Sequence, residues 1–341
     1  MIKTAIVILN WNGLGWLQRF LGGVVKYSTD PETAIYIADN GSTDGSADWI
    51  SGSFSEVKII RFEQNHGFAG GYNLAVKQIE AKYYVLLNSD VEVTEGWLSP
   101  LVKFMDQNEE VASCQPKIRS FYTRNSFEYG GAAGGYIDKY GYTFCRGRIF
   151  EMIEKDFGQY DTLADIFWST GACMIVRSEA WKKCGGLDGD FFAHMEEVDL
   201  CWRFHNAGLR VVCLPESVVY HAGGGALPYG SEQKTYLNFR NSLYLLYKNL
   251  PDKQLRQTIL IRGILDGAAA IRFCFLGMVR NVRAIWKAHR DFRKNIQSLK
   301  KKRNIVKGEK NSSLILNKSI VFRFYLKGER TFRNLQIQNQ S

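Results

Sequence analysis

The stretch Tyr84-Val85-Leu86-Leu87-Asn88-Ser89-Asp90-Val91 decides how the rest of the sequence is interpreted. Its apolar, partly β-branched run predicts a buried strand. Asn88 and Asp90 are two residues apart, so both leave the same face at the carboxyl end of that strand. Open α/β sheets bind their ligands at this edge. A carboxylate there suits Mg²⁺ or Mn²⁺, which complete their coordination with substrate phosphates. The alternative is a plain turn, since Asn, Ser and Asp dominate turns.

The chain before this stretch alternates strand and helix patterns. Strands are predicted at residues 4–10, 34–39 and 57–62, with a helix at 14–27 and another from the glycine-rich segment 65–73 to about residue 81. Parallel strands with crossover helices are the expected result, and the loops at their carboxyl ends converge on one cleft. The sequence therefore predicts an α/β fold. A dinucleotide-type Gly-x-Gly-x-x-Gly pattern after the first strand is absent, which disfavours a dehydrogenase.

Composition indicates a globular protein in a reducing compartment. The seven cysteines among 341 residues are odd in number, contain no Cys-x-x-Cys pair and lie mostly in apolar runs. This distribution is typical of buried reduced thiols, and we expect a cytoplasmic location. The first strand begins almost at the N-terminus, leaving no room for a signal peptide, and no apolar run approaches the length of a membrane span.

The net charge of +10 is concentrated near the C-terminus. Residues 252–310 hold 16 Lys or Arg against 4 Asp or Glu, which leaves the rest of the chain at −2. A nucleic-acid partner is therefore not expected. A basic C-terminal face that meets an anionic membrane surface is expected instead.

Seven polar or glycine-rich segments follow one another in order, at residues 6–12, 39–46, 65–73, 87–90, 169–177, 185–192 and 195–203. Together they resemble the motifs of the family 2 glycosyltransferases, in particular the rhamnosyltransferase-like branch. The resemblance runs from Ile6 to about Asn249. It implies a GT-A-type fold, in which a single Rossmann-like domain binds a nucleoside-diphosphate sugar.

The resemblance implies residues for the donor and for a divalent metal, Mn²⁺ or Mg²⁺. Asp39 matches the aspartate that holds the nucleotide base, although a capping or turn role is its alternative. Asp90 matches the last residue of the family's Asp-x-Asp metal motif, whose first aspartate is replaced here by Asn88. The remaining residues of the nucleotide-sugar cleft are Asn10, Asn65, Gly67, Asn73 and Ser89.

The acidic run Glu196-Glu197-Val198-Asp199 matches the family's Glu-Asp-x-Asp segment, whose second acid acts as general base. Such a base is needed because the acceptor hydroxyl must lose its proton as it attacks the anomeric carbon. Glu197 stands at the base position, where the family usually has Asp, and Glu196 and Asp199 are competing candidates. A first helical turn that merely favours acids is the alternative.

Four further residues are assigned by position. His221, at the end of a short predicted strand, matches a family histidine that completes the metal or diphosphate site; as a lone histidine it could equally be structural. Trp168, before the turn that contains Gly171, would either stack on a sugar ring or fill the core. Arg240 would contact a diphosphate or a lipid phosphate.

The domain division follows from the same patterns. Residues 1–250 are expected to form the catalytic domain, with a nucleotide-binding half to about residue 118 and an acceptor half from about 119 to 250. Residues 251–341 are expected to form a basic amphipathic helical extension and tail. If residues 272–294 are one helix, six cations fall within roughly an 80° arc. Such a helix would lie on a membrane or pack on the catalytic domain with its charged face in solvent. Residues 319–326 are interpreted as a final strand or an interfacial segment.

The expected function is that of an inverting glycosyltransferase. It would move a hexose or deoxyhexose, with rhamnose one candidate, onto a saccharide acceptor that is expected to be lipid-linked. The reaction would belong to cell-surface polysaccharide biosynthesis at the inner face of the cell membrane. The alternative is a non-catalytic nucleotide-sugar-binding or membrane scaffold protein with the same fold. A nucleotidyltransferase is disfavoured, because the segment Trp11-Asn12-Gly13-Leu14 lacks the basic, glycine-rich character of its first loop.

Overall fold

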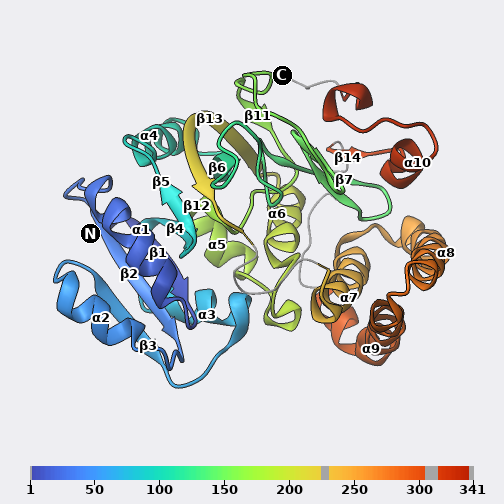
Figure 1. Cartoon of the computed structure of the whole chain (residues 1–341), viewed down its shortest axis with the longest axis horizontal. Coiled ribbons are helices and arrows are strands. Elements are labelled where there is room, and N and C mark those ends of the chain that lie inside the picture. Colours follow the sequence, from blue (N-terminus) through green and yellow to red (C-terminus); the bar gives the residue numbers. More distant parts are fainter. Residues whose placement is uncertain (1, 224–229, 304–313, 338–341) are drawn as a thin grey trace.

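The computed structural model describes residues 2–223, 230–303 and 314–337. Its central feature is a mixed sheet whose first half is parallel, in the strand order β3-β2-β1-β4 (Figure 1). These strands are β1 (Ile2–Asn10), β2 (Thr33–Asn40), β3 (Lys58–Phe62) and β4 (Ala81–Asn88). The predicted alternation of parallel strands and crossover helices is confirmed. The strand order reverses between β1 and β4, which is where doubly wound sheets open their ligand crevice.

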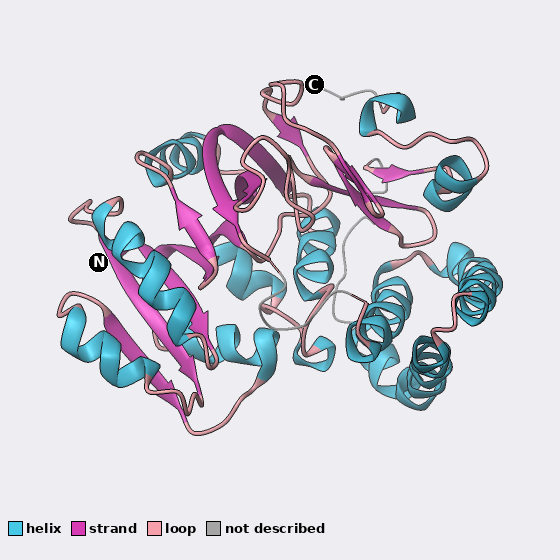
Figure 2. Cartoon of the chain, in the orientation of Figure 1, coloured by secondary structure: helices cyan, strands magenta, loops and turns pink. Residues whose placement is uncertain are grey.

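Helices cover both faces of the sheet, because successive residues of a strand point to opposite sides (Figure 2). On β1, Ile6 and Ile8 face one core with α1 (Leu14–Lys26), α2 (Ser46–Ser53) and α4 (Leu98–Gln107). Ala5 and Val7 face a second core with α3 (Gly67–Val76), α5 (Ser178–Cys184) and α6 (Glu196–Asn206). The result is a three-layer arrangement that buries the parallel strands on both sides.

The second half of the sheet is mixed. β12 (Cys173–Arg177) runs antiparallel to β4 and to β6 (Val111–Ser120), and β13 (Arg210–His221) runs parallel to β6. The short strands β5 (Val91–Val93) and β11 (Ala164–Asp165) pair antiparallel with β13. In this register His221 lies opposite Val91, so β13 delivers its terminal histidine beside the Asn88-Ser89-Asp90 edge.

A second, smaller sheet has the order β10-β9-β8-β7-β14. It consists of β7 (Gly135–Asp138), β8 (Thr143–Cys145), β9 (Arg148–Ile149), β10 (Met152–Ile153) and β14 (Ile315–Leu316). Because β14 comes from the C-terminal tail and pairs parallel with β7, the tail is part of the folded body. A 3-10 turn, η2 (Phe332–Leu335), packs its Phe332 ring against Tyr136 of this sheet.

Three long helices occupy the edge of the molecule farthest from β3 (Figure 1). They are α7 (Glu232–Asn249), α8 (Asp252–Phe275) and α9 (Val279–Arg303). The condition of a single helix over residues 272–294 is not met. The chain breaks at Gly277, whose φ of +69° is a left-handed conformation that glycine adopts without strain. α9 then packs along α7, with the Phe292 ring against Tyr244 and Tyr247.

The remaining parts of the tail and the cysteines complete the description. The prediction of a strand within residues 319–326 is wrong, because Ile320–Tyr325 form the short helix α10. All seven cysteines are free thiols; Cys274 is exposed and the other six are buried or half-buried. Among the described helices, none combines the length and the apolar character needed to cross a membrane.

Candidate active site

A cavity of about 1070 Å³ lies at the carboxyl ends of β1 and β4 and continues between α6, α7 and α8. The structure brings ten of the fifteen predicted site residues to its wall: Asn65, Gly67, Asn88, Ser89, Asp90, Trp168, Gly171, Glu196, Glu197 and His221. The other five lie outside its described lining: Asn10, Asp39, Asn73, Asp199 and Arg240. Most of the predicted site residues therefore lie around one cavity. The contacts of each residue, described below, show whether it lines the cavity or supports the residues that do.

The glycine-rich loop at the donor end is built into its neighbours. Gly67 has a φ of +71°, and a Cβ placed on it would lie 2.6 Å from the Phe192 ring. The Asn65 side chain accepts hydrogen bonds from the Gly67 amide (2.8 Å) and from the Asn40 side chain (2.9 Å). The amides of Phe68 and Ala69 donate to the Phe192 carbonyl oxygen. The first turn of α3 thus anchors the loop before α6.

Three predicted donor residues act as internal supports in this structure. The Asn10 side-chain amide donates to Asp39 (3.2 Å) and to the hydroxyls of Ser42 and Ser46. Asp39 is 5% exposed. Asn73 exchanges two hydrogen bonds with the backbone of Leu187, 114 residues away. A contact of these three residues with a nucleotide stays a prediction.

The predicted metal ligands Asp90 and His221 are adjacent and buried. The His221 Nε2 atom lies 3.1 Å from Asp90 Oδ1, and its Nδ1 atom lies 3.3 Å from an oxygen of Glu128. Burial disfavours charge on the imidazole, but the Glu128 and Asp90 carboxylates outweigh it and raise the pKa of His221 to about 10. Burial by itself would raise the pKa of Asp90, but the neighbouring His221 holds that pKa below its usual value.

Asp90 and His221 fit a divalent metal that shares its coordination with a substrate. Two neighbouring ligands of an octahedral ion lie about 3.0 Å apart, close to the separation of their oxygen and nitrogen atoms. No group of three or more His, Cys, Asp or Glu side chains in the described residues could hold a metal ion. A carboxylate and an imidazole therefore require further oxygens, which a diphosphate would supply. Metal bound to Nε2 would have to displace its proton.

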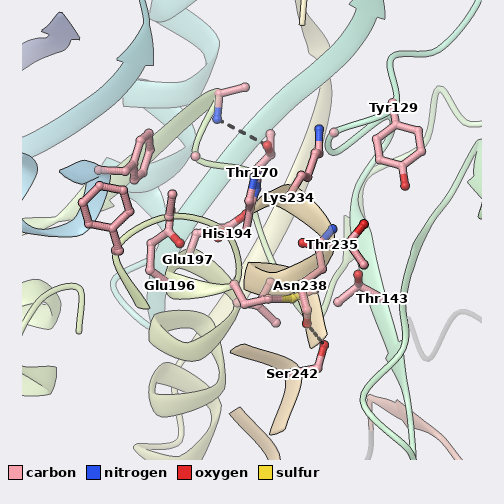
Figure 3. A pocket seen from close by; sticks show the side chains of 18 of the residues that line it. Tyr129, Thr143, Thr170, His194, Glu196, Glu197, Lys234, Thr235, Asn238 and Ser242 are labelled. Carbon is pink, nitrogen blue, oxygen red and sulfur yellow. Dashed lines mark hydrogen bonds between the residues drawn. The ribbon is translucent and has the colours of Figure 1, made fainter. Parts of the chain in front are cut away.

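Glu196 and Glu197 begin α6 with carboxylates turned to the cavity (Figure 3). The Oε2 atom of each is buried without a hydrogen-bond partner. Burial raises the pKa of Glu197 to about 7, although backbone amides of the first turn oppose the rise. Burial and the neighbouring Glu197 raise the pKa of Glu196 well above its usual range. Burial thus favours the protonated form of Glu196, and Glu197, whose pKa lies at about 7, is suited to exchange a proton near neutral pH.

Asp199 faces the opposite way, into the core. It is fully buried and ion-paired with Arg203 (2.8 Å) and Lys248 (2.9 Å), and it accepts a further hydrogen bond from Asn249 (2.8 Å). Despite the opposing effect of burial, Lys248 and Arg203 keep the pKa of Asp199 below its usual value. An anion with three donors and no exposed surface anchors α6 to α7, so Glu197 is the better-placed candidate base.

The segment before α6 is strained and clamped. Phe192, His194 and Met195 all have positive φ angles, between 64° and 73°, which non-glycine residues adopt at an energetic cost. The Asn241 side-chain amide on α7 donates to the carbonyl oxygens of Phe191, Ala193 and His194 at 2.7–3.0 Å. These hydrogen bonds hold the loop before Glu197 in its strained backbone conformation.

Arg240 takes part in the same clamp. Its guanidinium donates to the carbonyl oxygens of Asp190 and Phe191 and to the Tyr236 hydroxyl. The predicted phosphate contact is not supported by this position, because the group faces the loop and not the cavity. The sequence paired the adjacent Asn241 with Arg240 but gave no sign of its clamping role, which depends on carbonyl groups about 50 residues away.

The acceptor end of the cavity is lined by parts far apart in sequence. Figure 3 shows Glu196, Glu197 and His194 on one side and Tyr129 and Thr143 on the other, with Lys234 and Asn238 of α7 between them. Burial and Lys234 lower the pKa of His194 to about 4, so its imidazole is neutral. The end of the cavity nearest α8 and α10 carries a mostly apolar lining: Phe150, Leu265, Ala268, Phe273, Val321 and Tyr325.

The two predicted sugar-contacting positions form the floor. Trp168 is 4% exposed, donates its indole N–H to the Tyr136 carbonyl oxygen (2.9 Å) and presses its ring against Gly135. It is mainly a core residue with one edge at the cavity. Gly171 leaves room for the Phe68 ring, which would lie 2.8 Å from a Cβ at that position.

The family follows from comparison with known proteins. The sequence profile described as Glycosyl transferase family 2 matches residues 5–184, more than half of the chain. The chain is a family 2 glycosyltransferase. The expected family is thereby confirmed, and so is enzymatic activity of the transferase class.

Relatives of this glycosyltransferase include a rhamnosyltransferase. This chain is 25% identical over 228 residues to the N-acetylglucosaminyl-diphospho-decaprenol L-rhamnosyltransferase of Mycobacterium tuberculosis. The match covers 60% of this chain and 71% of the relative. The likeness supports the rhamnosyltransferase-like branch that the motifs indicated.

Solved structures confirm the GT-A-type fold of the glycosyltransferase. S. aureus TarS, residues 1–349 with UDP-GlcNAc, superimposes with a TM-score of 0.56 at 14% identity, over 89% of this chain and 90% of that one. GalNAc-T7 with UDP, GalNAc and Mn²⁺ has a TM-score of 0.57 at 16% identity, over 74% of this chain and 49% of that one. At these identities the likeness concerns the fold alone.

Proposed function

We propose that this glycosyltransferase moves a hexosyl or deoxyhexosyl residue, with rhamnosyl the first candidate, from a nucleoside-diphosphate sugar to a saccharide carried on a lipid diphosphate. The observation that carries the proposal is Glu197, a cavity carboxylate whose Oε2 atom has no hydrogen-bond partner and whose pKa is raised to about 7. It lies in the same cavity as the Asn88-Ser89-Asp90 edge and the apolar acceptor end. A single cavity can therefore hold donor, base and acceptor together.

The chemistry requires one proton transfer and one substitution at carbon. In this proposal Glu197 accepts the proton of the acceptor hydroxyl as its oxygen bonds to the anomeric carbon. The bond from that carbon to the diphosphate breaks on the opposite face, and the configuration inverts. Burial and Glu197 raise the pKa of Glu196, which favours a neutral neighbour beside the base.

Asp90 and His221 would hold the divalent metal, and a bound Mn²⁺ or Mg²⁺ would supply positive charge for the leaving diphosphate. Glu128 faces the other nitrogen of His221, which orients the imidazole toward the cavity. The support for metal use is the fit of this donor set together with the Mn²⁺ in the GalNAc-T7 structure.

The lipid-linked acceptor is supported by the cavity's far end. There α8 and α10 add an apolar wall, and Arg272 lies beside it. The name of the mycobacterial relative includes a diphospho-decaprenol acceptor. A saccharide with an attached lipid diphosphate combines the polar, anionic and apolar groups that such a wall would contact.

Donor binding is tested by thermal unfolding with UDP-, dTDP- and GDP-sugars, with and without Mn²⁺. A donor at 100 times its dissociation constant adds about 2.7 kcal/mol of stability. The Asp90→Ala variant should lose the Mn²⁺-dependent part of that gain and should lose turnover. If Asp90→Ala keeps its Mn²⁺-dependent donor affinity, the metal assignment is wrong.

Transfer itself is tested with the donor that binds and a short-chain lipid-diphosphate saccharide. The matched control acceptor is the same saccharide without the lipid diphosphate. Equal kcat/KM for the two acceptors would contradict the lipid-linked assignment without touching the transferase assignment.

A further inference from the structure

Helix α8 is amphipathic in the reverse sense. Its buried residues are all polar, namely Thr258, Arg262 and Asp266. Its exposed face carries Leu260, Ile264, Ile271 and Phe275, whose exposed fractions range from 60% for Ile271 to 87% for Phe275. At 100° per residue these four side chains fall within roughly a 60° arc, opposite the buried polar positions. A helix in water normally shows the opposite distribution.

The polar inner face is fully built. Arg262 pairs with Asp266 and donates to the Tyr140 carbonyl oxygen (3.0 Å). Asp266 in turn contacts His289 of α9 (2.9 Å) and the Tyr142 hydroxyl (3.4 Å). These bonds fix the rotation of α8, so its apolar stripe cannot turn inward. The stripe is therefore a permanent feature of the surface.

The apolar surface continues past the end of α8. Leu276 and Val279, at the break between α8 and α9, are 58% and 54% exposed. On the adjoining α10, Phe322 and Leu326 are exposed as well, and Tyr325 accepts a hydrogen bond from Arg272 of α8. Exposed apolar side chains gathered on neighbouring elements mark a site of association.

The charges around this surface favour an anionic partner. Residues 267–290 contain five Lys or Arg and no Asp or Glu. Arg283, Trp286 and Arg290 share one exposed face of α9 that starts at the same break, and the Arg290 guanidinium lies over the Trp286 ring. An indole flanked by arginines is typical of the boundary between lipid headgroups and acyl chains.

We propose that the apolar stripe of α8 and the adjoining break at residues 276–279 insert into the headgroup layer of an anionic lipid bilayer, with the cations of α9 resting on its surface. The sequence placed membrane contact on a basic helix at residues 272–294; the structure assigns the apolar part to α8 and leaves only the charges to α9. The surface extends the proposed function, since the other side of α8 lines the cavity through Leu265, Ala268 and Ala269.

The test uses the full chain and vesicles of phosphatidylcholine with 30% phosphatidylglycerol. The variant Ile264→Glu/Phe275→Glu should lower the vesicle partition coefficient by about tenfold or more, because it removes two apolar side chains that would enter the bilayer. The control Phe157→Glu/Leu163→Glu carries the same charge change at exposed apolar residues remote in sequence, and it should stay within about twofold of wild type. Equal losses of vesicle binding in the two variants would show that the added negative charge alone causes the loss, and this would overturn the proposed insertion.

Cys274 provides a second readout, because it is the exposed thiol of the seven and lies next to Phe275. An environment-sensitive fluorophore on Cys274 should shift to the blue on vesicle addition and be quenched by brominated acyl chains. Bound protein with an unchanged label would overturn the proposal. This measurement on the wild-type chain does not depend on the folding of any variant.

Two further outcomes are distinguishable. Light scattering without lipid that gives a dimer for wild type and a monomer for Ile264→Glu/Phe275→Glu would assign the stripe to a second copy and overturn the proposal. Donor-induced thermal shifts measured on both variants report the proposed function separately, because the substituted residues lie outside the donor end of the cavity. Either proposal can therefore fail without the other.

Discussion

The first turn of α6 has two faces that treat a carboxylate in opposite ways. On the cavity face, Glu197 has a buried oxygen with no hydrogen-bond partner, and burial raises its pKa to about 7. On the core face, two residues later, Asp199 is surrounded by Arg203, Lys248 and Asn249, and the pKa of its carboxyl is lowered. The same helix end therefore carries the proposed base and a structural acid.

The difference shows that proximity in sequence does not decide which acid is the base. Both residues belong to one motif, but a shift of two positions along the helix turns one side chain toward the cavity and the other toward α7. An acid that must exchange protons is left without strong partners, whereas an acid that must hold two helices together is saturated with them. Function and stability should therefore respond separately to substitutions on the two faces.

The largest expected effect is on the cavity face. Glu197→Gln keeps the shape of the side chain but cannot accept a proton, so kcat should fall by about 10²- to 10⁴-fold. Donor-induced thermal stabilisation should be unchanged. Glu197→Asp, the acid usual in the family, serves as the conservative control and should retain intermediate activity. If Glu197→Gln keeps most of its rate, the assignment of the base is wrong.

The core face should respond in stability. Asp199→Asn leaves Arg203 and Lys248 buried with less compensation, and the free energy of unfolding should fall by about 3–5 kcal/mol. Denaturant unfolding measures this loss, and kcat per folded molecule should remain close to wild type. Asp190→Asn removes a carboxylate that is 44% exposed and should change stability by less than about 1 kcal/mol. A stable but inactive Asp199→Asn would reverse the roles of the two faces.

The clamp behind the cavity face offers an intermediate test. Asn241→Leu removes the side-chain donor of the Ala193 and His194 carbonyl groups, while the Phe191 carbonyl keeps its bond from Arg240, and stability should fall by about 2–3 kcal/mol. The substitution should also lower kcat more than it raises the donor's KM, because the strained loop that presents Glu197 can relax. Ser242→Ala, at the neighbouring position on the same helix, is the control. Equal kinetics in Asn241→Leu and wild type would show that the base needs no clamp.

The smallest expected effect is a difference in pH dependence. The native pKa of Glu197 is raised above its unfolded value of about 4.5, so its contribution to stability is present at low pH and is lost as pH rises through 7. Asp199 has the opposite sign, and its contribution is lost as pH falls through its depressed native pKa. Glu197→Gln should therefore gain stability over wild type between pH 5 and pH 8, by about 1–3 kcal/mol. A constant difference across this range would contradict the raised pKa.

The parallel half of the sheet and the Asn88-Ser89-Asp90 edge could be predicted from the sequence, because both depend on patterns of neighbouring residues. The run from Tyr84 to Leu87 is apolar enough for a strand buried on both faces, and Asp90 follows at its end. The acidic turn of α6 was also visible. Which of its acids faces the cavity was not, because that depends on Lys248 and Asn249, about 50 residues away.

Other parts could not be predicted, because distant residues determine them. The strands of the smaller sheet are two to four residues long, too short for a periodic pattern. The reverse amphipathicity of α8 depends on Tyr140 and His289, which satisfy its buried polar groups from other elements. Glu128 reaches His221 only through the folded sheet, 93 positions along the chain.

Gly67 has a consequence for how this enzyme could change its donor. The missing side chain at that position is what lets the Phe192 ring pack against the donor loop, and the Phe68 amide holds the Phe192 carbonyl in the same place. Phe192 begins the loop that presents Glu197. Any side chain introduced at residue 67 must therefore displace the loop that carries the base. Under the proposed function, a donor preference altered at this glycine would come with an altered turnover rate, so the two properties would evolve together there.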